Sequence, residues 1–268
     1  MTLEVGMMQC PCVSHRKKLV QAFEEGEIDF RVCTECGIAF RERFPSLSEL
    51  EEIYRQAYVE EKIGSGNTNQ ESGGYAARSY AEFIRRSLWR TGARVLDYGA
   101  GSGALVERLR ANGVEASGIE FSSDARRFCR EKRGFSLMSN LDEVPNDHFD
   151  TVSMIEVVEH LTDLQGTLVQ LHRVIAPDGS LLVTTPNRKG LRARIENGHW
   201  REAQKKFHLF LFDWPSLKFH LEAAGFHDLR RVVFSPVQRP GLKTLVAVRL
   251  MQALRVSGTL SVIAKRSK

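Results

Sequence analysis

Short apolar runs alternate with stretches of helical periodicity from about residue 93 to the end of the chain. Apolar positions that are contiguous or alternate predict strands, and apolar positions every three or four residues predict helices. The predicted strands lie near 93–97, 114–120, 135–139, 149–155, 180–185, 228–235 and 258–265, and the predicted helices near 103–112, 123–133, 164–175 and 213–224. This order predicts an α/β fold with a doubly wound parallel sheet, to which the last pair of strands adds an antiparallel strand.

The first 74 residues follow a different pattern. Apolar runs at 18–23 and 28–33 flank a polar turn and predict a hairpin within a small module, residues 1–43. Ser46 and Glu49 have capping-box spacing and begin a predicted helix. The region 44–74 is therefore expected to be a helix followed by a mobile linker, because residues 59–74 have no periodicity and are rich in Gly, Ser, Asn and Gln.

The main domain is expected to cover residues 75–268. It begins with a predicted helix near 74–89. The aromatic side chains of this helix are expected to pack in the core, and Tyr75 is a candidate to close over a ligand. Near its end, residues 242–256 form an unusually apolar insertion punctuated by basic side chains. Packing of 242–256 against the body of the chain is the favoured interpretation, and a cover for the active site, a partner contact or a peripheral membrane contact stay open.

Composition narrows the class of protein. The chain has 268 residues, of which 42% are hydrophobic, and a formal net charge of +5. This length suits one α/β domain with a small appendage. No apolar run reaches the length of a membrane span, and the N-terminus lacks the layout of a signal peptide, so we expect a cytoplasmic location. The positive charge favours anionic partners such as nucleotide-linked substrates or RNA.

Four of the five cysteines cluster in the first 36 residues, and this placement indicates metal binding rather than disulfides. Cys33 and Cys36 have knuckle spacing and are followed by a glycine, whereas Cys10 and Cys12 are one residue tighter than usual. We expect a structural zinc-ribbon-like site made by Cys12, Cys33 and Cys36, with Cys10 or His15 as the fourth ligand. A degenerate ribbon without metal remains the alternative.

The strongest chemical signal is the glycine-rich turn after the strand near 93–97. Asp97 ends that strand, and Gly99, Gly101 and Gly103 lead into the next helix. Such a turn lets the backbone approach a bound nucleoside closely, and Glu120, after the next strand, has the two acceptor oxygens that both ribose hydroxyls require. These residues predict an adenosine-containing cofactor. The loose dinucleotide pattern that they also satisfy is weak by itself.

The surrounding sequence resembles the class I S-adenosylmethionine-dependent methyltransferases. The stretch from Asp97 to Gly103 reads D-x-G-x-G-x-G, like their first motif. Residues 149–161 are similar to their fourth strand and its "EHL" continuation, and residues 171–187 to their helix, turn and fifth strand. Asp178 stands where that family usually has glycine. The resemblance covers roughly residues 75–235 and implies a Rossmann-like sheet, the cofactor S-adenosylmethionine and methyltransferase activity.

The resemblance also implies roles for individual residues. The glycine loop would hold the methionine end of the cofactor, Glu120 the ribose, Asn140 the adenine, and the end of the fourth strand would lie beside the cofactor. The complete implied cofactor-binding set is Tyr75, Asp97, Gly99, Ala100, Gly101, Gly103, Glu120, Asn140, Ile155 and Glu156. His160 and His208 are the candidate catalytic bases, although a lone histidine is more often structural, and a nitrogen or carbon nucleophile needs no such base.

A narrower resemblance takes in nearly the whole chain. The cysteine cluster together with residues 198–226 is similar to bacterial methyltransferases of glycan and secondary-metabolite biosynthesis. It favours methyl transfer to oxygen on a small-molecule or glycan-type acceptor. The basic segment around Arg188 and Lys205 suits an acceptor that bears phosphate. A ribosomal RNA methyltransferase and a non-catalytic, cofactor-binding scaffold are the alternatives, and a nicotinamide-dependent enzyme is the weakest.

Overall fold

The computed structural model describes residues 10, 19–21, 30–42, 45–46, 49, 52, 70–232 and 256–267. The apolar insertion at 242–256 lies outside the described residues except for Val256, as do Cys12, His15 and most of the predicted helix after Ser46. At the start of that helix the predicted capping box is confirmed. The Ser46 N–H donates to Oε2 of Glu49 at 2.7 Å, and the Glu49 N–H donates to Oγ of Ser46 at 3.3 Å.

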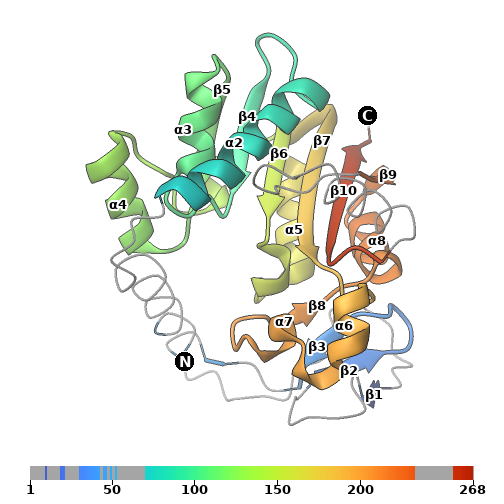
Figure 1. Ribbon diagram of the computed structural model, residues 1–268. Coiled ribbons are helices and arrows are strands. Elements are labelled where there is room, and N and C mark those ends of the chain that lie inside the picture. The colour runs from blue at the N-terminus through green and yellow to red at the C-terminus, as the bar shows by residue number, and fades with distance from the viewer. Residues whose placement is uncertain are drawn as a thin grey trace, which may run out of the picture.

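A six-stranded sheet forms the centre of the main domain, with the strand order β5-β4-β6-β7-β10-β9 (Figure 1). The four strands from β5 to β7 are parallel, and β10 runs antiparallel to both β7 and β9. The strands are β4 (Arg94–Tyr98), β5 (Glu115–Ile119), β6 (Phe149–Ile155), β7 (Ile175–Pro186), β9 (Phe226–Arg231) and β10 (Thr259–Arg266). The predicted α/β fold with an antiparallel addition at its end is confirmed.

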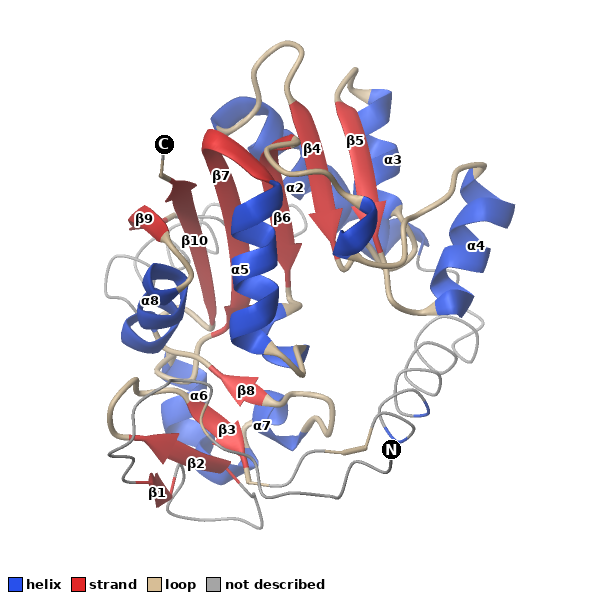
Figure 2. Cartoon of the chain, turned by 180° about the vertical axis from the view of Figure 1, so that it is seen from behind, coloured by secondary structure: helices blue, strands red, loops and turns tan. Residues whose placement is uncertain are grey.

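Helices cover both faces of this sheet. They are α2 (Gln70–Ser87), α3 (Ala104–Ala111), α4 (Ser123–Arg133), α5 (Leu164–Val174) and α8 (Trp214–Ala223). Successive strand residues point to opposite faces. Val95 accordingly packs with α2 and α3 in one core cluster, whereas Leu96 packs with α5 and α8 in the other. Figure 2 shows α5 in front of the sheet and α3 behind it.

Local differences from the predicted elements have simple causes. The predicted strand near 135–139 is wrong, because only Met138 makes an isolated bridge to Ile119 before the chain turns into a short 3₁₀ helix, Leu141–Glu143. Helix α2 begins at Gln70, so residues 70–74 are helical rather than part of the predicted linker. Asp178 adopts a φ of +62°, a left-handed conformation that aspartate tolerates better than most residues other than glycine.

A second, four-stranded antiparallel sheet has the order β1-β2-β3-β8. The predicted hairpin is confirmed by β1 (Leu19–Gln21) and β2 (Phe30–Cys33), which are followed by β3 (Ala39–Arg41). Its fourth strand, β8 (Phe210–Leu211), comes from the main domain. The parallel strands of the large sheet point toward this small sheet, which therefore lies at their carboxyl ends (Figures 1 and 2).

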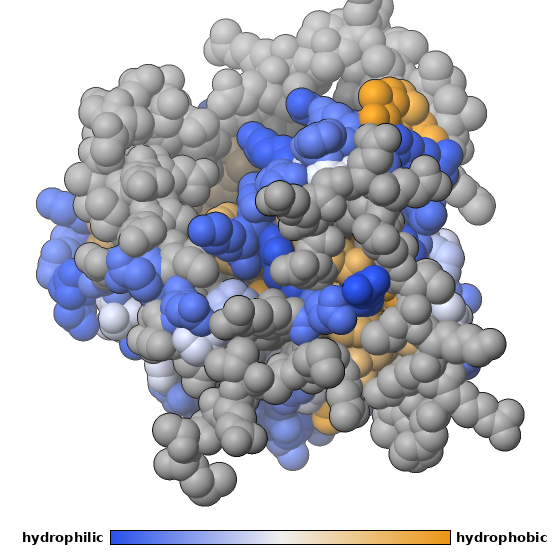
Figure 3. Space-filling view, turned by 90° about the horizontal axis from the view of Figure 1, so that it is seen from below, coloured by the Kyte–Doolittle hydropathy of each residue, from blue (hydrophilic) through white to orange (hydrophobic). Residues whose placement is uncertain are grey.

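Two short helices, α6 (Leu191–Glu196) and α7 (Arg201–Gln204), connect β7 to β8. Leu191 and Ile195 on α6 are exposed. Seen from below the view of Figure 1, hydrophilic residues cover most of the coloured surface, with smaller hydrophobic areas between them (Figure 3). Among the described residues, no helix is both long and apolar enough to cross a membrane.

Leu168→Ala tests the packing of α5 on the sheet. Leu168 is 0% exposed, so its truncation removes buried apolar surface and leaves a cavity, with an expected loss of about 2–5 kcal/mol in the free energy of unfolding. Val169→Ala is the matched control, because the neighbouring Val169 is 45% exposed and its change should stay within about 0.5 kcal/mol. Urea unfolding followed by circular dichroism measures both, and equal losses would contradict this assignment of the buried face.

Candidate cofactor and acceptor site

The turn from β4 into α3 carries three glycines in the left-handed backbone region, with φ of +80° at Gly99, +52° at Gly101 and +77° at Gly103. A Cβ at Gly99 would lie 2.4 Å from Cγ2 of Val157, so this position also lacks space for a side chain. A Cβ at Gly101 would meet nothing within 4 Å. The middle of the loop therefore faces open space, as a backbone that approaches a ligand must.

Glu120 lies against this loop. Its Oε2 accepts a hydrogen bond from the Gly101 N–H at 2.7 Å, and its Oε1 accepts one from the Ser122 N–H at 2.8 Å. The side chain is half-buried, at the carboxyl end of β5. The structure thus brings together the glycine loop and the carboxylate that the sequence assigns to the ribose. Binding by these two elements remains a prediction.

Asp97 is the buried acid of the site. It is 5% exposed, and its Oδ1 accepts a hydrogen bond from Oγ of Ser153 on β6 at 2.8 Å. Burial raises the pKa of Asp97 to about 7, and the nearby Glu120 carboxylate adds to this rise, whereas the Ser153 hydrogen bond opposes it. A carboxylate in such a place gains most from a cationic partner.

The other predicted cofactor residues lie around the same edge. Ala100 is buried, and Ile155 is the half-buried last residue of β6. Asn140 caps the short 3₁₀ helix with its Oδ1, two residues after Met138, whose carbonyl accepts from the Glu120 N–H at 3.0 Å. Tyr75 belongs to α2, but its side chain lies outside the described part of the structure.

Glu156 follows β6 with a φ of +53°, an uncommon conformation for a residue other than glycine. Thr184 on β7 holds it in place. The Glu156 N–H donates to the Thr184 carbonyl at 2.9 Å, and the Thr184 hydroxyl donates to Oε1 of Glu156 at 3.0 Å. Tyr80 of α2 is buried and hydrogen-bonds to Thr184, so α2 covers this edge of the sheet. Strain maintained in this way is typical of functional sites.

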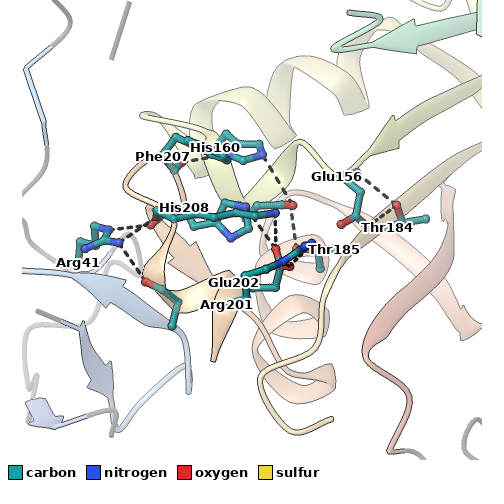
Figure 4. Close-up of polar contacts among 12 residues, drawn as sticks. Arg41, Glu156, His160, Thr184, Thr185, Arg201, Glu202, Phe207 and His208 are labelled. Atoms are coloured by element: carbon teal, nitrogen blue, oxygen red, sulfur yellow. Dashed lines mark hydrogen bonds and ion pairs between the residues drawn. The ribbon is translucent and has the colours of Figure 1, made fainter. Parts of the chain in front are cut away.

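Glu159, His160 and His208 form a cluster, and Glu156 lies close enough to affect the pKa of Glu159. Figure 4 shows His160, His208 and Glu156 in this region. Nδ1–H of His160 donates to the carbonyl oxygen of Phe207 at 2.9 Å, and the two imidazole rings lie 4.8 Å apart. Each of the three residues offers one atom that could ligate a metal ion, and these three atoms lie within 4.8 Å of one another. Oε2 of Glu159 accepts from the Thr185 hydroxyl at 2.9 Å. The structure therefore brings the two predicted catalytic histidines together.

Burial favours the neutral forms of these three side chains. It lowers the pKa of His160 to about 4 and that of His208 to about 2, and the proximity of the two imidazoles adds to the effect at His208. Burial, with the Glu156 carboxylate nearby, raises the pKa of Glu159 well above its ordinary value. Oε1 of Glu159 and Nδ1 of His208 have no hydrogen-bond partner among the described residues. Both atoms are buried, since Glu159 is 1% and His208 2% exposed, so a ligand could reach them only after a local rearrangement.

The basic segment between β7 and β8 is less positive than its composition indicates. Arg188 pairs with Asp213 at 2.7 Å, Lys205 with Glu202 at 2.6 Å, and Arg192 with Glu196. These ion pairs neutralise three basic side chains of the segment that favoured a phosphate-bearing acceptor. The preference for a phosphate group is correspondingly weaker.

The small sheet brings three of the predicted metal ligands together. The Sγ atoms of Cys10, Cys33 and Cys36 lie within 4.8 Å of one another, with 3.4 Å between those of Cys10 and Cys36, and all three side chains are buried. Sulfur atoms on a tetrahedral zinc ion lie about 3.8 Å apart, because Zn–S bonds measure about 2.3 Å. The separations fit a metal of this kind, although they do not reveal the fourth ligand.

Sequence reasoning missed several residues of the site. Glu159 has a signal in the sequence, because it directly precedes His160 in the "EHL" motif. Thr184 and Thr185 lie at the end of a predicted strand, where polar side chains gather in a parallel sheet. No local pattern indicates that Arg41, 162 or more residues away in sequence, contacts the carbonyls of Ala203 and Lys205.

An α/β sheet whose glycine loop meets an acidic residue after the next strand is typical of proteins that bind an adenosine-containing cofactor. Comparison with known families agrees. The chain matches the model of a methyltransferase domain family over residues 73–230, more than half of its length, and it belongs to that family.

The curated relatives match less than half of the chain. A ubiquinone biosynthesis O-methyltransferase of Methylococcus capsulatus is 32% identical over 117 residues, which cover 40% of this chain and 49% of that protein. The mitochondrial ubiquinone biosynthesis O-methyltransferase of Bos taurus is 32% identical over 132 residues, which cover 41% of this chain and 36% of that protein. The chain thus spans half or less of the length of these relatives.

Solved structures share the fold at lower identity. An S-adenosylmethionine-dependent methyltransferase from Archaeoglobus fulgidus has a TM-score of 0.55 and 22% identity, and the match covers 80% of this chain and all of that one. The [4+2]-cyclase SpnF has a TM-score of 0.58 and 19% identity, and the match covers 84% of this chain and 97% of that one. Because one of these neighbours is called a cyclase, the fold alone does not determine the reaction.

Asp97→Asn tests the buried acid. The pKa of about 7 in the native state lies above the value of about 4 in the unfolded chain, so between these pH values the native state binds more protons. The free energy of unfolding of the unaltered protein therefore falls as the pH rises through this window, and the variant lacks this loss. Relative to the unaltered protein, the variant should gain stability from pH 4 to pH 7, by at most about 1.4 kcal/mol per pH unit. Urea unfolding at several pH values measures this gain, and a constant difference would contradict it.

Proposed function

We propose that this protein is an S-adenosylmethionine-dependent methyltransferase that transfers a methyl group to a hydroxyl oxygen of a small molecule. The observation that carries the proposal is the meeting of Glu120 with the left-handed glycine loop, at the edge where Asp97 is buried. The O-methyltransferase names of the relatives that match 40–42% of the chain support transfer to oxygen.

Each part of the cofactor has a complementary group in this site. The raised pKa and the burial of Asp97 favour a cationic partner, such as the α-amino group of the methionine moiety. The carboxylate of Glu120 can exchange its bond to the Gly101 N–H for bonds from two ribose hydroxyls. Asn140 lies near the end of β5, where its side-chain amide can contact the adenine.

The acceptor lies, in this proposal, against Glu156 and the cluster of Glu159, His160 and His208. The bound cofactor supplies the methyl group, and the acceptor oxygen forms a bond to it as the carbon–sulfur bond breaks and its electron pair moves to sulfur. The acceptor proton moves to a base. His160 is neutral at pH 7, and its Nδ1 carries the proton that bonds to Phe207, so Nε2 has the lone pair that a base needs.

The acceptor is a hydroxyl compound without a required phosphate group. Carboxylates already neutralise Arg188, Arg192 and Lys205, whereas Oε1 of Glu159 and Nδ1 of His208 have no hydrogen-bond partner among the described side chains. A hydroxyl both donates and accepts, so it would suit these two atoms if acceptor binding opens the cluster that buries them. Aromatic hydroxyls and sugar hydroxyls both meet this requirement, so a glycan-type acceptor belongs to the same proposal.

Calorimetric titration with S-adenosylmethionine, S-adenosylhomocysteine and NAD tests cofactor binding. Micromolar binding of the first two and none of NAD is expected. Glu120→Gln should lower the affinity for S-adenosylmethionine at least about tenfold, the equivalent of losing one charge-assisted hydrogen bond. Glu115→Gln is the matched control, because Glu115 is exposed at the start of the same strand, and it should leave the affinity unchanged.

Binding alone does not establish transfer. The unaltered protein should move a labelled methyl group from S-adenosylmethionine to a small, nuclease-resistant compound in a cell extract. Label on RNA would instead indicate the RNA methyltransferase, and tight binding without transfer to any fraction would indicate the scaffold. Absence of binding to either methionine-derived ligand would overturn the whole proposal.

We also propose that Cys12 completes a structural zinc site with Cys10, Cys33 and Cys36. The three described sulfur atoms support this, and the β2–β3 hairpin that carries Cys33 and Cys36 has too small a core to be stable alone. With four protein ligands the ion would have no open position, so its role would be to stabilise the small sheet.

Metal analysis of the purified protein should find one zinc ion per chain. Cys33→Ser should remove it, because serine does not replace a thiolate in such a site. Cys129→Ser is the control, since Cys129 is a buried residue of α4 in the main domain and its loss should leave the zinc content unchanged. Full zinc content in Cys33→Ser, or none in the unaltered protein, would contradict the site.

A further inference from the structure

The small sheet is built partly from the segment that carries His208. Strand β8 begins two residues after His208 and pairs with β3, with Phe40 opposite Phe210 and Ala39 opposite Leu211. The Arg41 N–H extends this pairing by donating to the Leu209 carbonyl at 3.0 Å. The position of the loop before β8 therefore depends on the module that holds the cysteines.

The side chain of Arg41 strengthens this dependence. Its Nε donates to the carbonyl of His208 at 2.9 Å, and its Nη2 donates to the carbonyls of Ala203 at 3.1 Å and Lys205 at 2.9 Å (Figure 4). One guanidinium thus bonds three carbonyls of the same loop. The rigid fork of arginine suits this arrangement, whereas the single ammonium of a lysine does not reproduce it.

A second arginine ties the cysteine knuckle to the main domain. Nη2 of Arg188 donates to the carbonyl of Gly37 and to Oδ2 of Asp213, both at 2.7 Å. Gly37 directly follows Cys36, and its N–H donates to the Cys33 carbonyl at 2.8 Å. Only five positions separate Cys36 from Arg41. Hydrogen bonds thus connect the predicted metal site, the Cys33–Gly37 knuckle and the 203–209 segment.

The segment held by Arg41 determines the tautomer of His160 and the position of the His208 ring. The carbonyl of Phe207 accepts the Nδ1–H of His160 and so selects its tautomer, and the buried ring of His208 packs 4.8 Å from that of His160. The cofactor side uses other contacts, since Asp97 bonds to Ser153 and Glu120 bonds to the loops at the large sheet. A shift of the 203–209 segment would therefore act on the two histidines and leave these contacts of Asp97 and Glu120 in place.

We propose that Arg41 is a positioning residue, through which the cysteine module places the 203–209 loop and holds His160 and His208 in the geometry for accepting a proton. The identification of that side as the acceptor side rests on the function proposed above. A zinc ion held by the cysteines would stabilise the strand that ends at Arg41, and in that way the position of the 203–209 segment.

Hydrogen exchange of the full chain tests the proposal without requiring an acceptor. In Arg41→Met, amides of residues 203–209 should exchange at least about tenfold faster, because the loop loses three hydrogen bonds. Arg41→Lys should give an intermediate rate, since it retains the charge but not the fork. Arg31→Met is the matched control, because Arg31 lies on the adjacent β2 and forms a half-exposed pair with Glu42.

Two further readouts separate positioning from general damage to the fold. The ¹⁵N spectrum of His160 should show one fixed tautomer in the unaltered chain and a mixture in Arg41→Met, because the bond to Phe207 is lost. Calorimetry should give an affinity for S-adenosylmethionine within about twofold of the unaltered value in both variants, the change of about 0.4 kcal/mol that a distant site allows.

The outcomes are distinct. Unchanged exchange at 203–209 together with an unchanged His160 tautomer in either Arg41 variant would overturn the positioning role. If Arg41→Met does not fold, Arg41→Lys decides, because it keeps the charge and the apolar stem. A failure of the unaltered chain to bind S-adenosylmethionine would instead overturn the proposed function, and it would leave the exchange result unaffected.

Discussion

Parallel pairing of β4 with both of its neighbours is the constraint on which the rest of the site depends. In this register Asp97 lies opposite Gly118 of β5 and Ser153 of β6. Since parallel strands end at the same edge, the residues that follow them meet there: the glycine loop after β4, Glu120 after β5 and Glu156 after β6. A shift of either pairing by one residue would move these side chains to the wrong face. The buried Ser153–Asp97 bond, which joins two of these strands, helps to specify the register.

Much of this edge is predictable from the sequence, because its signals are local. The glycines, the acid after each strand and the helix caps all follow from short-range rules, and the predicted capping box of Ser46 with Glu49 forms. Short-range rules fail at the predicted strand near 135–139. Its apolar residues Leu137 and Met138 do lie against β5, but Met138 forms only one isolated β-bridge. Two residues later, Asn140 caps a 3₁₀ helix. Composition does not show over how many residues an apolar segment pairs with the neighbouring strand.

The acceptor side could not be predicted in the same way, since its contacts are non-local. The pairing of β3 with β8 joins residues 170 or more positions apart, and only two pairs of residues define it. Such a short strand has no periodicity, so the segment from Arg188 to Phe212 reads as basic loop rather than as part of a sheet. For the same reason the ion pairs of Arg188 and Lys205, which remove much of its positive charge, are visible only in the structure.

Burial has opposite consequences for the two sides of the site. On the cofactor side, Asp97 loses hydration, and a cationic ligand group would restore a favourable partner for its charge. On the proposed acceptor side, burial keeps His160 and His208 neutral, which preserves their lone pairs but makes them weak bases. A weak base suffices when the proton leaves late, as the oxygen–methyl bond forms and the acceptor becomes more acidic. The position of the histidines then matters more than their basicity, and that position depends on the loop and the small sheet behind it.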